Sequence, residues 1–215
     1  MSEPKLEFLG KGCEHYIDLS RITDKSVMVD AGCCTGTFIE RIRKFTNAKI
    51  YAIECAKNNL DFLNEKNFDN VEIEEKALIG LKGETIKMLE FKGSKRKPDG
   101  TPQYHRWANV IGNHKDRFKD DDDTEMTEYE VEPLTIADLI KKYDLKQIDF
   151  FKVDIEGSEY EVFENISQDH ASMIKQMSIE VHIPEKDPQL VRHLEHLGFK
   201  TIKSGPNELY AYRED

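Results

Sequence analysis

The 215-residue sequence predicts an α/β fold: a mostly parallel sheet with helices on both faces. Three observations predict it. Short apolar runs alternate with segments of helical spacing, and a glycine-containing loop joins the first run to the first helix. Near the end of the chain, two strand-like runs flank Gly205-Pro206 and predict a closing antiparallel pair. The alternation implies right-handed crossovers between parallel strands.

The first part of the chain contains three strands and two helices in alternation. Apolar runs predict buried strands, and apolar residues three or four positions apart predict helices. In chain order we expect a strand at 26–30, a helix at 37–45, a strand at 49–54, a helix at 57–67 and a strand at 71–74.

The alternation of predicted strands and helices stops in an insert at about residues 82–133. A basic stretch at 92–97 and a four-aspartate run at 120–123 are typical of solvated segments. Between them lie Tyr104, His105 and Trp107, the only tryptophan of the chain. Long irregular inserts in compact domains are often lids or binding loops. We therefore expect a single domain over residues 1–215, with an irregular insert that forms a substrate lid.

Regular structure resumes at Thr135, which can cap a helix together with Asp138 in an approximate capping box. The remaining expected elements are a strand at 148–154, a helix at 159–166, a strand at 176–182, a helix at 188–197 and the closing strands at 199–203 and 208–212.

Composition excludes several classes of protein. A net charge of −11 argues against non-specific nucleic-acid binding, which needs clustered Lys and Arg. The four cysteines form no CxxC pair, which favours free thiols in a reducing compartment. The N-terminus lacks the apolar stretch of a signal peptide, and no apolar run has the length of a membrane span. We expect a soluble cytoplasmic protein with no nucleic-acid or membrane partner; its oligomeric state is open.

The loop from Asp30 to Gly36 is the first candidate binding site. It lacks the G-x-G-x-x-G spacing of dinucleotide loops, and the carboxylate of Asp30 would repel a diphosphate. That carboxylate suits a ligand with a cationic end, such as S-adenosylmethionine. Glu54, 18 residues after Gly36, ends the next strand, where an acid can bind both ribose hydroxyls. A glycine turn beside an unrelated Glu and an NAD-type site are the alternatives.

A second constellation follows the later strands. Lys152, Asp154 and Glu156 alternate at one strand end, and Glu180 and His182 have the same spacing on the next strand. Ligands of open α/β sheets bind beyond these strand ends, so both groups should face the glycine loop.

Three interpretations of these residues are open. The structural one is a buried ion pair of Lys152 with Asp154 or Glu180. In the second, Asp154, Glu180 and His182 ligate a divalent cation such as Mg²⁺ or Mn²⁺. In the third, Glu156, Glu180 or His182 is a general base that removes a hydroxyl proton during methyl transfer.

Three stretches resemble the FkbM family of class I S-adenosylmethionine-dependent methyltransferases. They are residues 29–36, residues 134–140 with 148–162, and the Glu-x-His element at 180–182. The resemblance implies the Rossmann-like, seven-stranded class I fold and O-methylation, often of sugars or other small hydroxylated molecules. Cys33-Cys34 and Cys55-Ala56 depart from the residues expected for the family, without removing a group that the cofactor chemistry needs.

Site residues can be carried over from this resemblance. Lys76 and Ala77 would lie near the adenine, and Asp154 between cofactor and substrate. The methionine and ribose ends would be held by Asp30, Gly32, Cys34, Thr35, Gly36 and Glu54.

The expected activity is O-methylation of a sugar or glycoconjugate hydroxyl. In the insert, Tyr104, His105 and Trp107 can stack on a sugar ring, with ordinary lid packing as the alternative. The alternative functions are methylation of another small hydroxylated metabolite, methylation of a peptide or nucleic acid, and cofactor binding without turnover.

Overall fold

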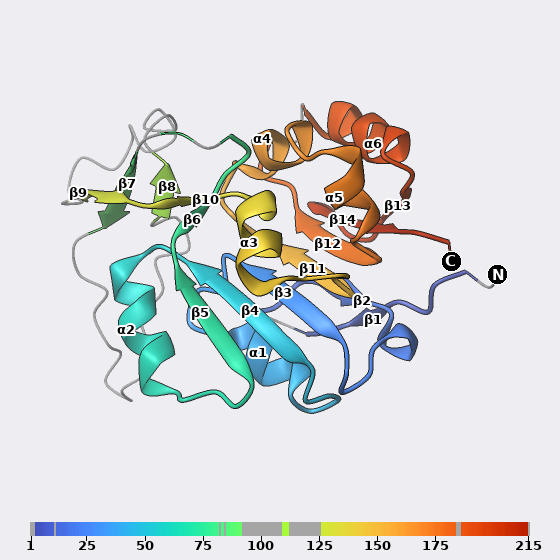
Figure 1. The fold of residues 1–215 in the computed structure, drawn as a ribbon, viewed down its shortest axis with the longest axis horizontal. Coiled ribbons are helices and arrows are strands. Elements are labelled where there is room, and N and C mark those ends of the chain that lie inside the picture. The colour runs from blue at the N-terminus through green and yellow to red at the C-terminus, as the bar shows by residue number, and fades with distance from the viewer. Residues whose placement is uncertain are drawn as a thin grey trace.

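The computed structural model describes residues 3–10, 12–81, 83, 85–91, 109–111, 126–183 and 186–214. Its main feature is a seven-stranded sheet (Figure 1). From one edge to the other the strands are β13 (Lys200–Lys203), β14 (Glu208–Tyr212), β12 (Gln176–Glu180), β11 (Phe150–Val153), β3 (Val27–Ala31), β4 (Lys49–Glu54) and β5 (Val71–Glu75). Strand β14 is antiparallel to both neighbours, and the strands from β12 to β5 are parallel. The predicted sheet is confirmed.

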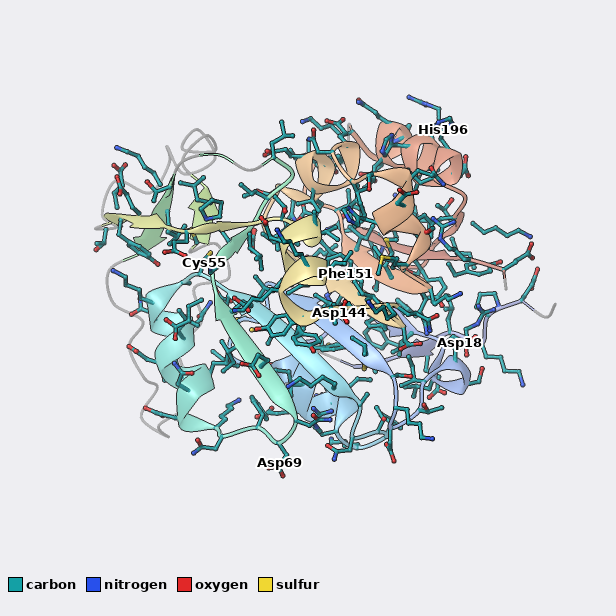
Figure 2. All side chains as sticks on the ribbon, viewed as in Figure 1. Asp18, Cys55, Asp69, Asp144, Phe151 and His196 are labelled. Carbon is teal, nitrogen blue, oxygen red and sulfur yellow. The ribbon has the colours of Figure 1, made fainter. Side chains whose placement is uncertain are left out.

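Helices cover both faces of this sheet. The helices of the described residues are α1 (Thr37–Ile42), α2 (Lys57–Glu65), α3 (Ile136–Tyr143), α4 (Glu159–Glu164), α5 (Gln168–Ser172) and α6 (Asp187–His196), with a 3-10 helix at Leu19–Arg21. Successive strand residues point to opposite faces. Accordingly, Val29 and Phe151 pack in one core with α3 to α6, whereas Met28 and Phe150 pack in the other with α1 and α2. Figure 2 shows Phe151 deep among these side chains.

Outside the insert, each expected strand and helix is present, with ends displaced by at most three residues. The capping box at the start of α3 is also present: the Thr135 side chain accepts from the Asp138 amide, and the Asp138 carboxylate accepts from the Thr135 amide. Helix α5 is an element that the apolar spacing does not predict.

The expectation of an irregular insert is wrong for its described part. Strand β7 (Ile86–Phe91) pairs antiparallel with β8 (Asn109–Ile111) and with β9 (Met126–Val131), forming a separate three-stranded sheet (Figure 1, left). A short parallel pair, β6 (Ala77–Leu78) with β10 (Pro133–Leu134), precedes and follows this small sheet along the chain. Whether the insert is a lid stays a prediction.

Two short strands precede β3: β1 (Glu7–Phe8) and β2 (Tyr16–Ile17), which pair antiparallel. Polar contacts attach this N-terminal segment to β12. The Asp18 amide donates to Gln176 Oε1 at 3.1 Å, and His15 Nδ1 lies 3.0 Å from Ser178 Oγ. Because Gln176 and Ser178 are both fully buried polar residues, these contacts have no apolar signature in the sequence. Leu9, Cys13 and Ile17 of the segment also pack in the core with α1 and α2. In the described part of the chain, no helix has the length and apolar character to cross a membrane.

Candidate active site

Four side chains beyond the carboxyl ends of β11 and β12 converge on one point, and we call Asp154, Glu156, Glu180 and His182 the acidic cluster. His182 Nε2 lies 3.4 Å from Glu156 Oε2, 3.8 Å from Asp154 Oδ1 and 3.9 Å from Glu180 Oε1. The side chains of Asp154, Glu156 and Glu180 are 28%, 26% and 32% exposed, so ligands in solvent can reach them. The sequence-based expectation that these residues lie together is confirmed.

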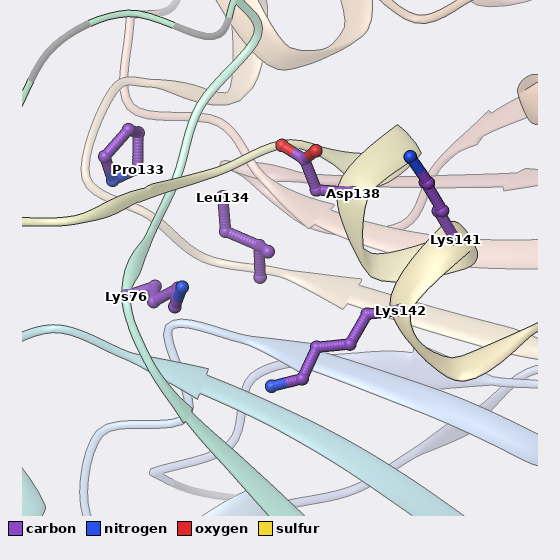
Figure 3. A pocket seen from close by; sticks show the side chains of 6 residues that line it. All are labelled: Lys76, Pro133, Leu134, Asp138, Lys141 and Lys142. Carbon is purple, nitrogen blue, oxygen red and sulfur yellow. The ribbon is translucent and has the colours of Figure 1, made fainter.

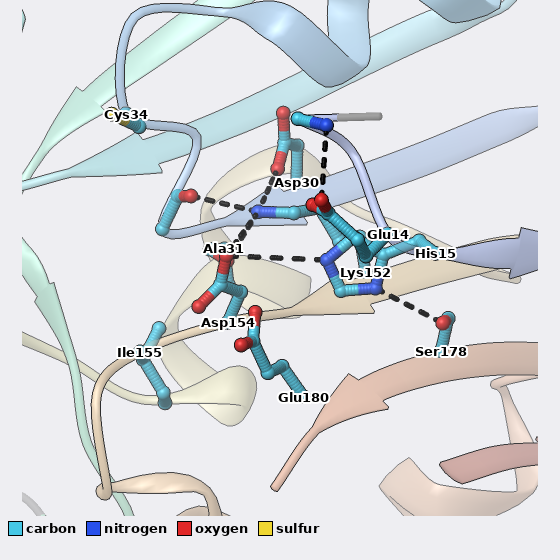
Figure 4. A network of polar contacts seen from close by, with 12 residues as sticks. Glu14, His15, Asp30, Ala31, Cys34, Lys152, Asp154, Ile155, Ser178 and Glu180 are labelled. Carbon is cyan, nitrogen blue, oxygen red and sulfur yellow. Dashed lines mark hydrogen bonds and ion pairs between the residues drawn. The ribbon is translucent and has the colours of Figure 1, made fainter. Parts of the chain in front are cut away.

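Lys152 connects the acidic cluster to the glycine loop (Figure 4). The register of β11 on β3 places Lys152 opposite Asp30. Its Nζ lies 3.0 Å from Asp30 Oδ1 and 3.7 Å from Asp154 Oδ2, and donates to the Gly32 carbonyl at 2.7 Å. Burial alone would lower the pKa of Lys152, but Asp30 and Asp154 reverse this and raise the pKa, which keeps the ammonium charged.

The ion pair expected between Lys152 and Asp154 is therefore present, and Asp30 is an additional partner. The side chain of Asp30 is completely buried. Burial raises the pKa of Asp30, and the charge of Lys152 opposes that shift. The structure thus shows Asp30 holding Lys152 inside the protein, and direct contact of Asp30 with a cofactor stays a prediction.

The glycine loop touches the acidic cluster at Gly32. This residue has φ +71°, and a Cβ there would lie 1.7 Å from the Asp154 carbonyl oxygen. Gly36, with φ +85°, is the N-cap of α1. Between them Thr35 is buried, while Cys34 is partly exposed with a positive φ of 50°. Only glycine adopts such backbone freely and permits the approach at residue 32.

Glu54 holds the glycine loop from the neighbouring strand. Its Oε2 accepts from the Cys34 amide at 2.8 Å, and its Oε1 accepts from the amides of Cys55 and Ala56 at 2.9 and 2.8 Å. Burial raises the pKa of Glu54 to about 7 in spite of these three donors. The structure brings Glu54 to the loop as expected, and its predicted contact with ribose hydroxyls is not tested.

Protonation differs among the members of the acidic cluster. Burial would raise the pKa of Asp154, but the charge of Lys152 and a hydrogen bond with His15 hold it well below its usual range. Burial and the Asp154 charge raise the pKa of Glu180 to about 8. Burial would lower the pKa of His182, but Glu159 reverses this and raises it to about 9. At neutral pH, Asp154 is ionised and His182 carries a proton on both nitrogens.

His15 is a site residue that the sequence analysis misses. It comes from the N-terminal segment and is 2% exposed, and its Nε2 lies 4.0 Å from Asp154 Oδ2 (Figure 4). Burial lowers the pKa of His15, so its imidazole is neutral. A lone histidine in a segment without periodicity carries no sequence signal, because only the docking of that segment on β12 brings it to Asp154.

Two groups of described side chains have the composition and spacing of a cation site: His15 with Asp154 and Glu180, and Asp154 with Glu156 and His182. In each group the candidate ligand atoms lie within 4.8 Å of one another. The expected set of Asp154, Glu180 and His182 is thus divided between two groups that share Asp154.

Lys76 and Ala77 are expected near the adenine; Lys76 lines a different hollow, whereas Ala77 packs with Ala56. Lys76 forms an ion pair with Glu132 at 2.8 Å, and Ala77 is buried at the start of β6. A cavity of about 360 Å³ is lined by Lys76, Pro133, Leu134, Asp138, Lys141 and Lys142 (Figure 3). This lining contains no residue of the acidic cluster or the glycine loop, so we do not treat this cavity as the active site. Tyr104, His105 and Trp107 lie outside the described residues.

Comparison with known proteins identifies the family. The model of the FkbM methyltransferase domain matches residues 30–201, which include the glycine loop and the whole acidic cluster. The chain belongs to the FkbM methyltransferase family. It is therefore a methyltransferase, and its fold is the Rossmann-like class I fold that the sequence predicts. Membership implies S-adenosylmethionine as the methyl donor. His15 lies outside the matched range.

Each individual relative shares only a small fraction of its sequence with this chain. The chain is 25% identical over 207 residues to methyltransferase sdnD of Sordaria araneosa, covering 86% of this chain and 78% of that protein. Among solved structures, a precorrin-6y C5,15-methyltransferase from Geobacter metallireducens has a TM-score of 0.47 at 15% identity, covering 91% and 84% of the two chains. A precorrin 8w decarboxylase from Methanobacterium thermoautotrophicum has a TM-score of 0.48 at 13% identity, covering 92% and 86%. These similarities carry no information about the acceptor.

Proposed function

We propose that this FkbM-family protein transfers the methyl group of S-adenosylmethionine to a hydroxyl of a sugar or glycoconjugate. The observation that carries the proposal is the contact between the two motifs. Gly32 is so close to Asp154 that a Cβ at residue 32 would overlap the Asp154 carbonyl. The glycine loop and the acidic cluster are therefore parts of one site, although Gly32 and Asp154 lie 122 positions apart in the sequence.

The side chains of this site fit a donor with ammonium and sulfonium charges. Asp154 is ionised and partly exposed, and Glu156 and Glu180 add further carboxyl groups beside it. Bound here, the cofactor would supply a methyl group on a positively charged sulfur, whose charge is lost on transfer. A cluster of carboxyl groups attracts that charge.

We assign Glu180 the role of general base. Its carboxyl group lies at the end of β12, within reach of solvent and close to His182. In its ionised form, which predominates above its pKa of about 8, Glu180 would accept the hydroxyl proton as the acceptor oxygen bonds to the methyl carbon and the S–CH₃ bond breaks. A base in such a position contributes about 10²–10⁴-fold to the rate, and alignment of the acceptor contributes as well.

The family resemblance and the chemistry of the cluster support the proposed acceptor class. Carboxylates accept hydrogen bonds from hydroxyl groups, so the cluster can orient a polyhydroxylated acceptor. Another small hydroxylated metabolite is the alternative acceptor.

The direct test is transfer of radiolabelled methyl from S-adenosylmethionine to a panel of glycosides and hydroxylated metabolites. We expect label in at least one glycoside. Label only in non-sugar metabolites would correct the acceptor class and leave O-methylation intact. Cofactor binding without transfer to any compound would instead indicate a regulatory binding module. Label only in peptide or nucleic acid would overturn the proposal.

A further inference from the structure

We infer that Asp154, Glu156 and His182 bind a divalent transition-metal cation and that buried Glu159 holds His182 in the ligating orientation. The inference concerns the same site as the proposed methyl transfer and rests on that function for its purpose. Its test measures cation binding and needs no methyl transfer, so the inference and the proposed function can fail separately.

The orientation of His182 is the first argument. Its Nδ1 lies 2.8 Å from Oε1 of Glu159, a side chain with no exposed surface. The same carboxylate oxygen accepts from the amides of Ile155 and Gly157 at 3.1 and 3.2 Å, which fixes its position. An oxygen that accepts from two amides also accepts from the imidazole, so Nδ1 carries a hydrogen. Nε2 then faces the acidic cluster, and a cation that binds there displaces its proton. A carboxylate behind a histidine in this way is the usual support of a metal-binding imidazole.

The spacing of the ligand atoms is the second argument. His182 Nε2 lies 3.4 Å from Glu156 Oε2 and 3.8 Å from Asp154 Oδ1. Tetrahedral ligands at typical zinc distances lie about 3.3–3.4 Å apart. Neighbouring ligands of octahedral Mg²⁺ lie closer, at about 3.0 Å. An imidazole with two carboxylates also suits Mn²⁺ or Zn²⁺ better than Mg²⁺.

Charge and access are the third argument. Lys152 approaches Oδ2 of Asp154, whereas His182 faces Oδ1, so a cation at Oδ1 does not replace the ammonium. Carboxyl groups outnumber cationic groups among the described residues of this site, and grouped negative charges are costly when partly buried. Glu156 and Asp154 are each about a quarter exposed, which leaves an entry path and positions open for a substrate oxygen.

Calorimetric titration of the full, chelator-treated chain with Mn²⁺, and separately with Zn²⁺, tests the inference. We expect one cation to bind per chain with a dissociation constant well below about 1 mM. Glu156→Gln removes a ligand and should weaken binding at least tenfold. Glu159→Gln should weaken it about 10–100-fold, the usual effect of losing the partner behind a metal-bound histidine. Glu14, next to His15 in the N-terminal segment, is half-buried and lies outside the proposed ligand set (Figure 4). As a control, Glu14→Gln removes one nearby negative charge and should change affinity less than about threefold.

Each other outcome overturns the inference. No binding by the folded chain at about 1 mM Mn²⁺ and Zn²⁺ would show that Lys152 and a protonated His182 balance the carboxylates without a cation. Weaker binding in Glu180→Gln but not in Glu156→Gln would place the cation with His15 instead. Equal binding in all variants would indicate an unrelated surface site. If Glu159→Gln fails to fold, the Glu156→Gln variant still tests the inference, because Glu156 is partly exposed. A parallel S-adenosylmethionine titration shows whether the cofactor site is intact.

Discussion

Lys152 is the side chain on which both motifs of the site depend. It is a buried residue of β11 opposite Asp30 of β3, and its ammonium compensates the fully buried Asp30 while approaching Asp154. Its hydrogen bond to the Gly32 carbonyl also fixes the start of the glycine loop. Removing one partner of a buried ion pair leaves an uncompensated charge in the interior, which is far more costly than removing both.

Lys152→Met should therefore lower the free energy of unfolding by about 3–5 kcal/mol. Urea denaturation at neutral pH measures this change. The double variant Asp30→Asn with Lys152→Met leaves no isolated charge and should recover part of the loss. Equal stabilities of Lys152→Met and the unmodified protein would show that the ion pair does not hold the site together.

Glu180→Gln tests the proposed base. Turnover should fall by about 100-fold or more, because a neutral amide cannot accept the hydroxyl proton, while affinity for S-adenosylmethionine stays unchanged. Steady-state kinetics with the glycoside that accepts label, together with calorimetry, separates the two effects. Glu14→Gln is the matched control for loss of a nearby charge. Unchanged turnover in Glu180→Gln would remove it from the mechanism.

At the residue scale, the sequence predicts which side chains lie in the site but not all of the ion pairs and contacts that they form. Asp154, Glu180 and His182 were predictable because the ends of parallel strands share one edge of a sheet. The pairing of Lys152 with Asp30 depends on β11 lying next to β3, which the chain order alone does not specify. His15 depends on the polar docking of a short segment on β12, for which hydrophobic periodicity gives no signal.

The glycine loop is the element that joins cofactor binding to the acidic cluster. Gly32→Ala places a Cβ 1.7 Å from a backbone oxygen and forces alanine to adopt φ +71°. Backbone strain of this kind costs about 1–3 kcal/mol, and the overlap requires the loop or the end of β11 to move. We expect lower stability and at least tenfold weaker binding of S-adenosylmethionine.

Thermal denaturation and calorimetry check this prediction. Gly83→Ala is its control, because a Cβ at Gly83 would meet nothing within 4 Å. The control should match the unmodified protein in both measurements. Gly32→Ala with normal affinity and stability would contradict the close approach of loop and cluster.

Elements with apolar periodicity are the ones that sequence predicts well. The inner strands of the central sheet follow from buried apolar runs, the strand at 71–75 follows from its alternating pattern, and the start of α3 follows from its capping residues. The sheet in the insert does not, because β9 carries Thr127, Glu128 and Glu130 among its six residues and has its partner β7 far away in sequence. Non-local pairing of half-polar strands gives no local signal.

For the whole molecule, the topology explains why distant residues form one site. The central position of β3, between β4 and β11, places its loop beside the strand end that carries Asp154 and next to the end that carries Glu54. The N-terminal segment then adds His15 from a part of the chain outside the family match.

The pH dependence of stability is a property of the whole molecule to which Glu54 contributes. Its folded pKa of about 7 lies above the usual value of 4.5, so this stabilising contribution is present below about pH 4.5 and is lost as pH rises through 7. The full change is on the order of 3 kcal/mol. The folded pKa values of Glu180 and His182 are raised as well, so their stabilising contributions are also lost as pH rises, at higher pH than that of Glu54.

Denaturation at several pH values between 5 and 8 should show falling stability in the unmodified protein and a flatter profile in Glu54→Gln. Comparing the two proteins isolates Glu54 from other titrating groups. Identical profiles would mean that Glu54 is not the buried acid described above.

The most direct test of the account is calorimetric titration of the full chain with S-adenosylmethionine. We predict binding at one site per chain and at least tenfold weaker binding in Gly32→Ala, because the glycine loop and the strand end at Asp154 form that site together. No binding by the unmodified, folded chain at millimolar cofactor would contradict the account.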